Sequence, residues 1–128
     1  MPSFGTLKAD TLTHSTAGSL ATNYVVEGSA KVWINFNGTG TIATRDSFNV
    51  TSITDGGTGL YTVTYTNSLG NVNYSTTGAA GENDDSGGNR SLGLRARAVG
   101  SQNLRGFRDG VSADDMAEMC IQITGDLA

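Results

Sequence analysis

The chain has 128 residues with a formal net charge of −4, 37% hydrophobic and 16% charged residues, and eight basic residues in no continuous run. This balance excludes a charged disordered tail, and nucleic acid or an anionic membrane would require concentrated Lys and Arg. We therefore expect no nucleic-acid partner. We also expect no membrane insertion and no secretory signal peptide, because no apolar run approaches about 20 residues and Met1 begins a polar segment.

Gly, Thr, Ser and Asn dominate the composition, which favours short strands joined by many turns. With so little aliphatic mass, the core of a single chain would be thin. Chains of this kind often complete their burial by oligomerising, and we expect a homo-oligomer.

Residues 1–28 form an amino-terminal arm in our interpretation, and residues 29–128 form the β domain. The large apolar residues of the arm are spaced irregularly, which fits neither a helix nor a long strand. They are Phe4, Leu7, Leu12 and Leu20. Short extended pieces are expected at residues 5–12 and 21–27. The arm either docks on another protein by adding a strand to its sheet or lies on its own domain as a first strand.

Residues 30–66 carry the clearest pattern. Apolar side chains alternate with polar ones at residues 30–36 and again at 60–66, which predicts strands with one buried face. Trp33 alternates away from the apolar set and is expected on the outer face. Glycine-rich clusters at residues 37–40 and 55–59 predict the turns.

The sequence patterns that predict the remaining elements are weaker. A short edge strand is expected at 41–44, a strand at 48–53, a strand with Tyr74 at 72–77, an exposed loop at 78–90, a strand at 92–99, and a turn or short strand at 103–109. Ser112 followed by Asp115 resembles a helix N-cap, so one helical turn is expected at 113–117, followed by a strand at 119–124. The pattern predicts an all-β fold, an antiparallel β-sandwich of jelly-roll or Greek-key type.

No constellation of residues indicates catalysis or a cofactor. Glu82, Asp84 and Asp85 lack the spacing of a calcium loop and are interpreted as a solvated loop. His14 has no second histidine, and Cys120, the only cysteine, reads as a core thiol. We expect no enzyme, no metal and no cofactor.

Candidate interaction residues are aromatic or basic. Trp33 suits sugar stacking or a subunit interface, although a strand buried on both faces would hide it. Five of the basic residues lie within residues 90–108, where they could bind anionic groups, pair with a neighbouring subunit or simply be solvated. The candidate set is Trp33, Tyr74, Arg95, Arg97, Arg105, Phe107 and Arg108.

The central run AKVWINFNGTGTIATRDSFNVTSITDGGTGLYTVTYTN resembles a β domain found in virion proteins of tailed bacteriophages, many of them described as tail fibres. The resemblance continues at NVNY (71–74) and at LRAR (94–97), and it covers about residues 29–124.

This resemblance implies a non-enzymatic, trimeric fibre module in the virion. Its arm would join baseplate, tail or capsid proteins, and its loops would meet a host-surface glycan or protein. Members often carry the domain at the end of a long fibre, whereas here only residues 1–28 precede it. We therefore expect a short tail fibre, with a capsid decoration protein and a free carbohydrate-binding module as alternatives.

Overall fold

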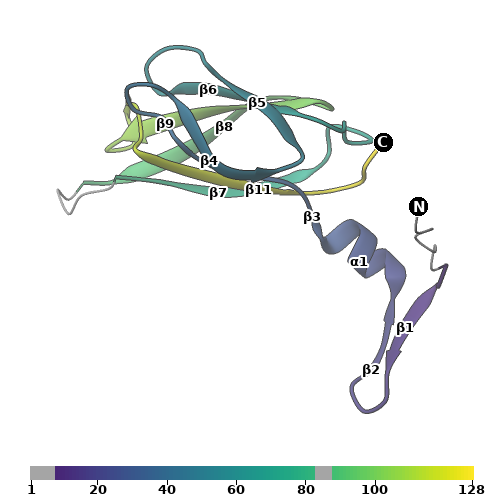
Figure 1. The fold of residues 1–128 in the computed structure, drawn as a ribbon. Coiled ribbons are helices and arrows are strands. Elements are labelled where there is room, and N and C mark those ends of the chain that lie inside the picture. Colours follow the sequence, from purple (N-terminus) through teal and green to yellow (C-terminus); the bar gives the residue numbers. More distant parts are fainter. Residues whose placement is uncertain (1–7, 83–87) are drawn as a thin grey trace.

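The computed structural model describes residues 8–82 and 88–128. Most of these residues lie in antiparallel β-sheets, which confirms the predicted all-β class. Figure 1 shows two sheets stacked on each other and, outside them, an arm formed by β1, β2 and α1.

The first sheet has four strands in the order β4-β3-β11-β7. Their bounds are β3 Ala30–Asn37, β4 Ala43–Phe48, β7 Ser75–Gly81 and β11 Glu118–Thr124. The last strand of the chain thus lies between two strands that precede it by many residues, a placement that no local pattern specifies.

The second sheet has five strands, and β9 pairs with three of them, namely β6, β8 and β10, while β5 pairs with β6. The bounds are β5 Val50–Asp55, β6 Leu60–Tyr65, β8 Arg90–Ala98, β9 Ser101–Arg108 and β10 Ser112–Ala113.

One hydrophobic core lies between the two sheets. The alternating residues of β3 and β6 that were predicted to face inward are buried, and they pack with Leu104 of β9 and with side chains of β11. These core residues are Val32, Ile34, Phe36, Tyr61, Val63, Tyr65, Met119, Ile121 and Ile123. The period-of-two prediction is therefore confirmed for both strands.

Both predicted glycine-rich turns are present. In the turn before β6, Gly57 adopts a φ of 103° and Gly59 a φ of 67°, a region that favours glycine. The change of sheet between β4 and β5 occurs at Asn49, which also has a positive φ of 57°. Its side-chain amide nitrogen donates to the carbonyl oxygens of Lys31 and Asn67, which fixes this corner.

Two expectations on local structure are wrong. Residues 22–28 form a helix, α1 (Thr22–Gly28), instead of an extended piece, and the helix begins where the Thr22 hydroxyl donates to the Ala9 carbonyl. Residues 113–117 form no helical turn. Their polar groups instead bond to distant residues, as in the 2.7 Å bond from the Gly59 N–H to Asp115.

The later strands differ in their bounds from those expected. The strand expected at 72–77 begins after Tyr74, and β7 and β8 extend into the expected loop, of which residues 83–87 lie outside the described residues. Of the expected turn or short strand at 103–109, residues 103–108 belong to a full strand, β9. The terminal strand expected at 119–124 is confirmed as β11.

Candidate functional site

The arm exposes apolar side chains instead of burying them. Strands β1 (Thr11–His14) and β2 (Gly18–Ala21) form a hairpin in which Leu12 lies opposite Leu20. These two predicted docking residues are 43% and 44% exposed. The other two, Phe4 and Leu7, lie outside the described residues.

Helix α1 adds residues that the sequence analysis missed. It has no buried residue, and Tyr24, Val25 and Val26 are exposed. A shallow groove of about 520 Å³ runs between α1 and β1, with Leu12, Val25 and Val26 among its lining residues. The described part of the arm therefore exposes several large apolar side chains outside the β domain, next to polar and charged residues of the same groove.

His14 has a structural place in the arm. Its Nδ1 atom accepts hydrogen bonds from the backbone N–H groups of Thr16 and Ala17, which close the β1–β2 turn. Within the described residues no group of three His, Cys, Asp or Glu side chains gathers as a metal site would require.

Trp33 lies on the outer face of the four-stranded sheet, half-buried, as its place in the alternation predicted. Across the sheet it pairs with Phe48 of β4 on one side and with Gln122 of β11 on the other, and Gln122 in turn pairs with Thr77 of β7. Phe48 is 55% exposed, which is high for a phenylalanine.

A groove of about 450 Å³ lies beside Trp33, where small side chains of β7 and β11 leave space. We call this surface the Trp33 patch and define it as Trp33, Phe48, Thr77, Ala79, Cys120 and Gln122. The sequence pointed only to Trp33, because the pairing of β3 with β11 joins residues far apart in the chain. The interpretation of Cys120 as a core thiol is wrong: it is only partly buried and lines this groove on the outer face, since it alternates with the buried Met119 and Ile121 of β11.

Tyr74 does not lie on the surface. It is 4% exposed, its ring packs against Tyr65, and its hydroxyl donates to the carbonyl of Ala98 or Ser101. The expectation that it contacts a partner is therefore wrong for the described chain. Tyr74 lies where the chain enters β7 and closes one end of the core.

The arginines that the sequence grouped together lie in different surroundings. Arg97 is held by Tyr74, with its guanidinium carbon 5.6 Å from the ring centroid and a hydrogen bond to the Tyr74 carbonyl. In a regular strand Arg95 and Arg97 would share one face, but a register shift in β8 between Leu94 and Arg97 interrupts the alternation.

Arg105 and Phe107 do come together. Both lie on the same face of β9, and the Arg105 guanidinium carbon is 4.9 Å from the ring centroid of Phe107. Arg95 lines a separate groove of about 360 Å³ with Leu60, Thr62 and Asn103.

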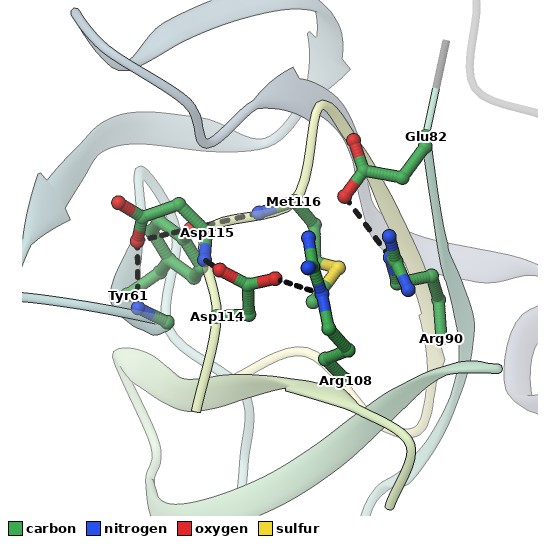
Figure 2. Close-up of polar contacts among 8 residues, drawn as sticks. Tyr61, Glu82, Arg90, Arg108, Asp114, Asp115 and Met116 are labelled. Carbon is green, nitrogen blue, oxygen red and sulfur yellow. Dashed lines mark hydrogen bonds and ion pairs between the residues drawn. The ribbon is translucent and has the colours of Figure 1, made fainter. Parts of the chain in front are cut away.

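The other basic residues of this segment form ion pairs, drawn in Figure 2. Arg108 pairs with Asp114 at 2.7 Å, and Arg90 pairs with Glu82 at 3.0 Å. Glu82 thus serves as a structural partner, whereas Asp84 and Asp85 lie outside the described residues.

A polar cluster joins the turn before β6 to the segment before β11. The Tyr61 hydroxyl lies 3.2 Å from Asp115 Oδ1 and accepts a hydrogen bond from the Met116 N–H (Figure 2). It also lies 3.0 Å from the Gly38 carbonyl oxygen. Burial raises the pKa of Tyr61 well above its usual range, and a hydrogen bond with the Met116 backbone opposes part of this rise. Burial likewise raises the pKa of Tyr65, assisted by Tyr74.

Comparisons with protein-family models, with curated proteins and with solved structures find no match to this chain. Among the described residues, no helix is long and apolar enough to span a membrane.

Proposed function

We propose that this chain is a non-enzymatic structural protein of a bacteriophage virion. In this proposal it is a short tail fibre that attaches to other virion proteins through residues 1–28. The β domain is a sandwich of Greek-key or jelly-roll type, assembles as a homotrimer, and meets the host surface. The proposal needs no cofactor.

The observation that carries the proposal is the division of apolar surface between arm and domain. The β domain encloses a buried core between its two sheets, although some of its apolar side chains are exposed. In the described part of the arm, by contrast, no apolar side chain is buried, and Leu12, Leu20 and Val26 are exposed. An exposed apolar surface of this kind marks a site of contact with another protein. A strand hairpin and a short helix on a separate arm suit attachment better than they suit catalysis.

The use of the acidic residues supports a non-enzymatic role. Asp115 accepts from the Gly59 N–H, and Asp114 pairs with Arg108, so both adjacent carboxylates hold the segment before β11 in place. Carboxylates with such partners act as structural groups, whereas general acids and bases must face a cleft that admits substrate.

The test removes residues 1–20 from the chain in the bacteriophage that encodes it. We expect the shortened β domain to keep its thermal unfolding transition and to be missing from purified particles. A paired set of full-length variants refines the result: Leu12→Ser with Leu20→Ser is expected to reduce incorporation strongly. The control Val111→Ser, at an 81% exposed position of the β9–β10 turn, is expected to leave incorporation unchanged.

Quantification of the chain in purified particles separates the related alternatives. A few copies per particle indicate a tail fibre, whereas copies over the whole shell indicate a capsid decoration protein. A chain that is absent from particles and binds glycan as a soluble monomer would contradict the proposal and favour a carbohydrate-binding module.

A further inference from the structure

We propose that the groove beside Trp33 binds a neutral glycan. The inference deepens the proposed function, on which it rests for the source of the ligand, because it assigns contact with the host surface to one face of the four-stranded sheet. In this arrangement the C–H face of a sugar ring lies against the aromatic side chains of the Trp33 patch, and the sugar hydroxyls bond to the polar side chains beside them.

Two aromatic side chains provide the apolar support. Trp33 is half-buried and lines the groove of about 450 Å³, and Phe48, which is 55% exposed, lies directly opposite Trp33 on β4. The small residues Ala79 and Cys120 line the same groove. An aromatic ring beside such a space buries the C–H groups of a sugar, while the sugar hydroxyls stay free to bond elsewhere.

Polar side chains with free hydrogen-bonding groups surround this support. Gln122 and Thr77 line the groove and are exposed, and their side chains make no hydrogen bond to another described residue. Asn35 also lines the groove, and its side-chain oxygen accepts from Arg45 at 3.1 Å, which leaves its amide nitrogen to donate. Amide and hydroxyl side chains offer both donors and acceptors, as the hydroxyls of a sugar do, so the two sets of groups match.

The charges on this face favour a neutral glycan. The exposed carboxylates of Asp46 and Glu118 lie on the same face as the groove. The two cations of these four strands already have partners, since Arg45 donates to two backbone carbonyl oxygens and Lys31, 7% exposed, donates to Ser29. An acidic glycan would therefore meet two carboxylates and no uncommitted cation of this sheet as described. A neutral sugar gains from the same carboxylates, because they accept strong hydrogen bonds from hydroxyl groups.

The same polar groups disfavour a protein as the occupant. A protein surface covering this face would remove water from Gln122, Thr77 and both carboxylates, which costs free energy unless each group finds a new partner. A second copy docked face to face would also bring its own carboxylates against them, and like charges in contact are repulsive. A glycan bonds to these groups through its hydroxyls, so the exchange of water for ligand loses few hydrogen bonds.

The experiment screens the purified full-length chain against an array of oligosaccharides and measures each positive result by isothermal titration calorimetry. The neutral probes are oligosaccharides of glucose, mannose, galactose and N-acetylglucosamine. The acidic probes are alginate and hyaluronate oligosaccharides of similar length. We expect at least one neutral probe to bind and to change the fluorescence of Trp33, the only tryptophan, and we expect the acidic probes not to bind.

Variants of the groove locate the bound glycan. Gln122→Ala and Thr77→Ala are each expected to weaken binding by about two- to tenfold, the effect of losing one hydrogen bond. Trp33→Phe, which keeps a smaller ring, is expected to weaken binding in the same direction. The matched control is Thr54→Ala, which removes an exposed threonine from a strand of the other sheet and is expected to bind like the wild type. Thermal unfolding of each variant confirms that it is folded.

The outcomes separate this inference from the proposed function. A wild-type chain that binds no neutral probe, or acidic probes only, overturns the neutral-glycan site, although attachment to the virion stands. Binding that Gln122→Ala and Thr77→Ala both leave unchanged places the glycan elsewhere and also overturns the site. Binding that these variants weaken, in a chain that is absent from purified particles, supports the site and contradicts the proposed function.

Light scattering on the same variants tests the alternative occupant. If Gln122→Ala and Trp33→Phe weaken the self-association of the chain and leave glycan binding unchanged, the patch joins two copies and the glycan site is overturned.

Discussion

The Tyr61 hydroxyl joins three segments that are far apart in the chain. Its ring lies in the core against Phe36, with ring centroids 5.2 Å apart, and its hydroxyl meets the turn after β3 and the segment before β11. A buried hydroxyl with several partners fixes these segments relative to one another.

Tyr61→Phe removes that hydroxyl and keeps the ring. We expect the free energy of unfolding to fall by about 1–2 kcal/mol, because the Met116 N–H and the Gly38 carbonyl then lose a buried partner. Urea denaturation followed by Trp33 fluorescence measures the change. Tyr24→Phe, at an exposed position of α1, is the matched control and is expected to change stability by less than about 0.5 kcal/mol. Equal effects of the two changes would contradict the role given to Tyr61.

The raised pKa values of Tyr61 and Tyr65 make the fold sensitive to alkali. Both hydroxyls stay protonated in the folded chain at a pH where they ionise in the unfolded chain. Their stabilising contribution is therefore complete below about pH 10, the ordinary pKa of tyrosine, and is lost as the pH rises further. Each such tyrosine lowers the free energy of unfolding by up to about 1.4 kcal/mol per pH unit in that range.

Urea denaturation from pH 8 to 11.5 measures this dependence, and Tyr65→Phe is the informative variant. We expect the variant to show a shallower decline above pH 10 than the wild type, since one buried ionisable hydroxyl is gone. A decline of the same slope in both proteins would show that Tyr65 does not contribute.

The burial of Tyr74 could not be predicted from the sequence alone. It lies among Asn, Val and Ser residues in a stretch that reads as an ordinary half-exposed strand. Its burial depends on Tyr65, Ala98 and Ser101, which reach it only after both sheets have formed. Nothing in the local pattern signals such a contact.

The turn before β6 depends on a glycine with two constraints. Gly59 has a positive φ, and a Cβ atom there would lie 2.8 Å from the Gly106 carbonyl oxygen and 2.9 Å from the Asp114 nitrogen. Gly57, two residues earlier, also has a positive φ but faces open space. The pair therefore separates backbone strain from steric crowding.

We expect Gly57→Ala to destabilise the chain by about 1–2 kcal/mol, the cost of the backbone conformation alone. Gly59→Ala is expected to cost at least about 2 kcal/mol more, because the added methyl displaces the segment before β11. Thermal or urea unfolding of both variants measures the difference. If the two substitutions lower the free energy of unfolding equally, the close approach of the backbone at Gly59 does not contribute to stability.

At the scale of elements, the accuracy of the sequence predictions followed the strength of the alternation. Strands β3 and β6 have large apolar residues at every second position and were predicted within one residue of their observed ends. Strand β7 consists of small residues, STTGAAG, whose pattern is too weak to define its bounds. Helix α1 carries two adjacent β-branched valines, so its local propensity resembles that of a strand.

Residues of the candidate surfaces could be predicted from the sequence only where the signal lies within a single strand or hairpin. Leu12, Leu20 and Trp33 stand out in the sequence because each is a large apolar residue in a polar or alternating context. Phe48, Gln122 and Thr77 join the Trp33 patch through pairings between distant strands. The patch is therefore a property of the assembled sheet.

At the level of the whole molecule, the core between the two sheets stabilises the β domain. We propose that the exposed arm has a separate task and attaches the chain to a particle. A lysine side chain can report which proteins lie next to the arm. Lys8 is exposed on the arm, whereas the only other lysine, Lys31, is 7% exposed and donates to Ser29.

Cross-linking mass spectrometry on purified bacteriophage particles therefore tests whether the arm attaches the chain to a virion. With an amine-reactive reagent, Lys8 is the accessible lysine of the described chain, so its cross-links report the neighbours of the arm. We expect cross-links between Lys8 and a different virion protein. Particles that lack the chain, or that contain it with Lys8 linked to no other protein, would contradict attachment through the arm.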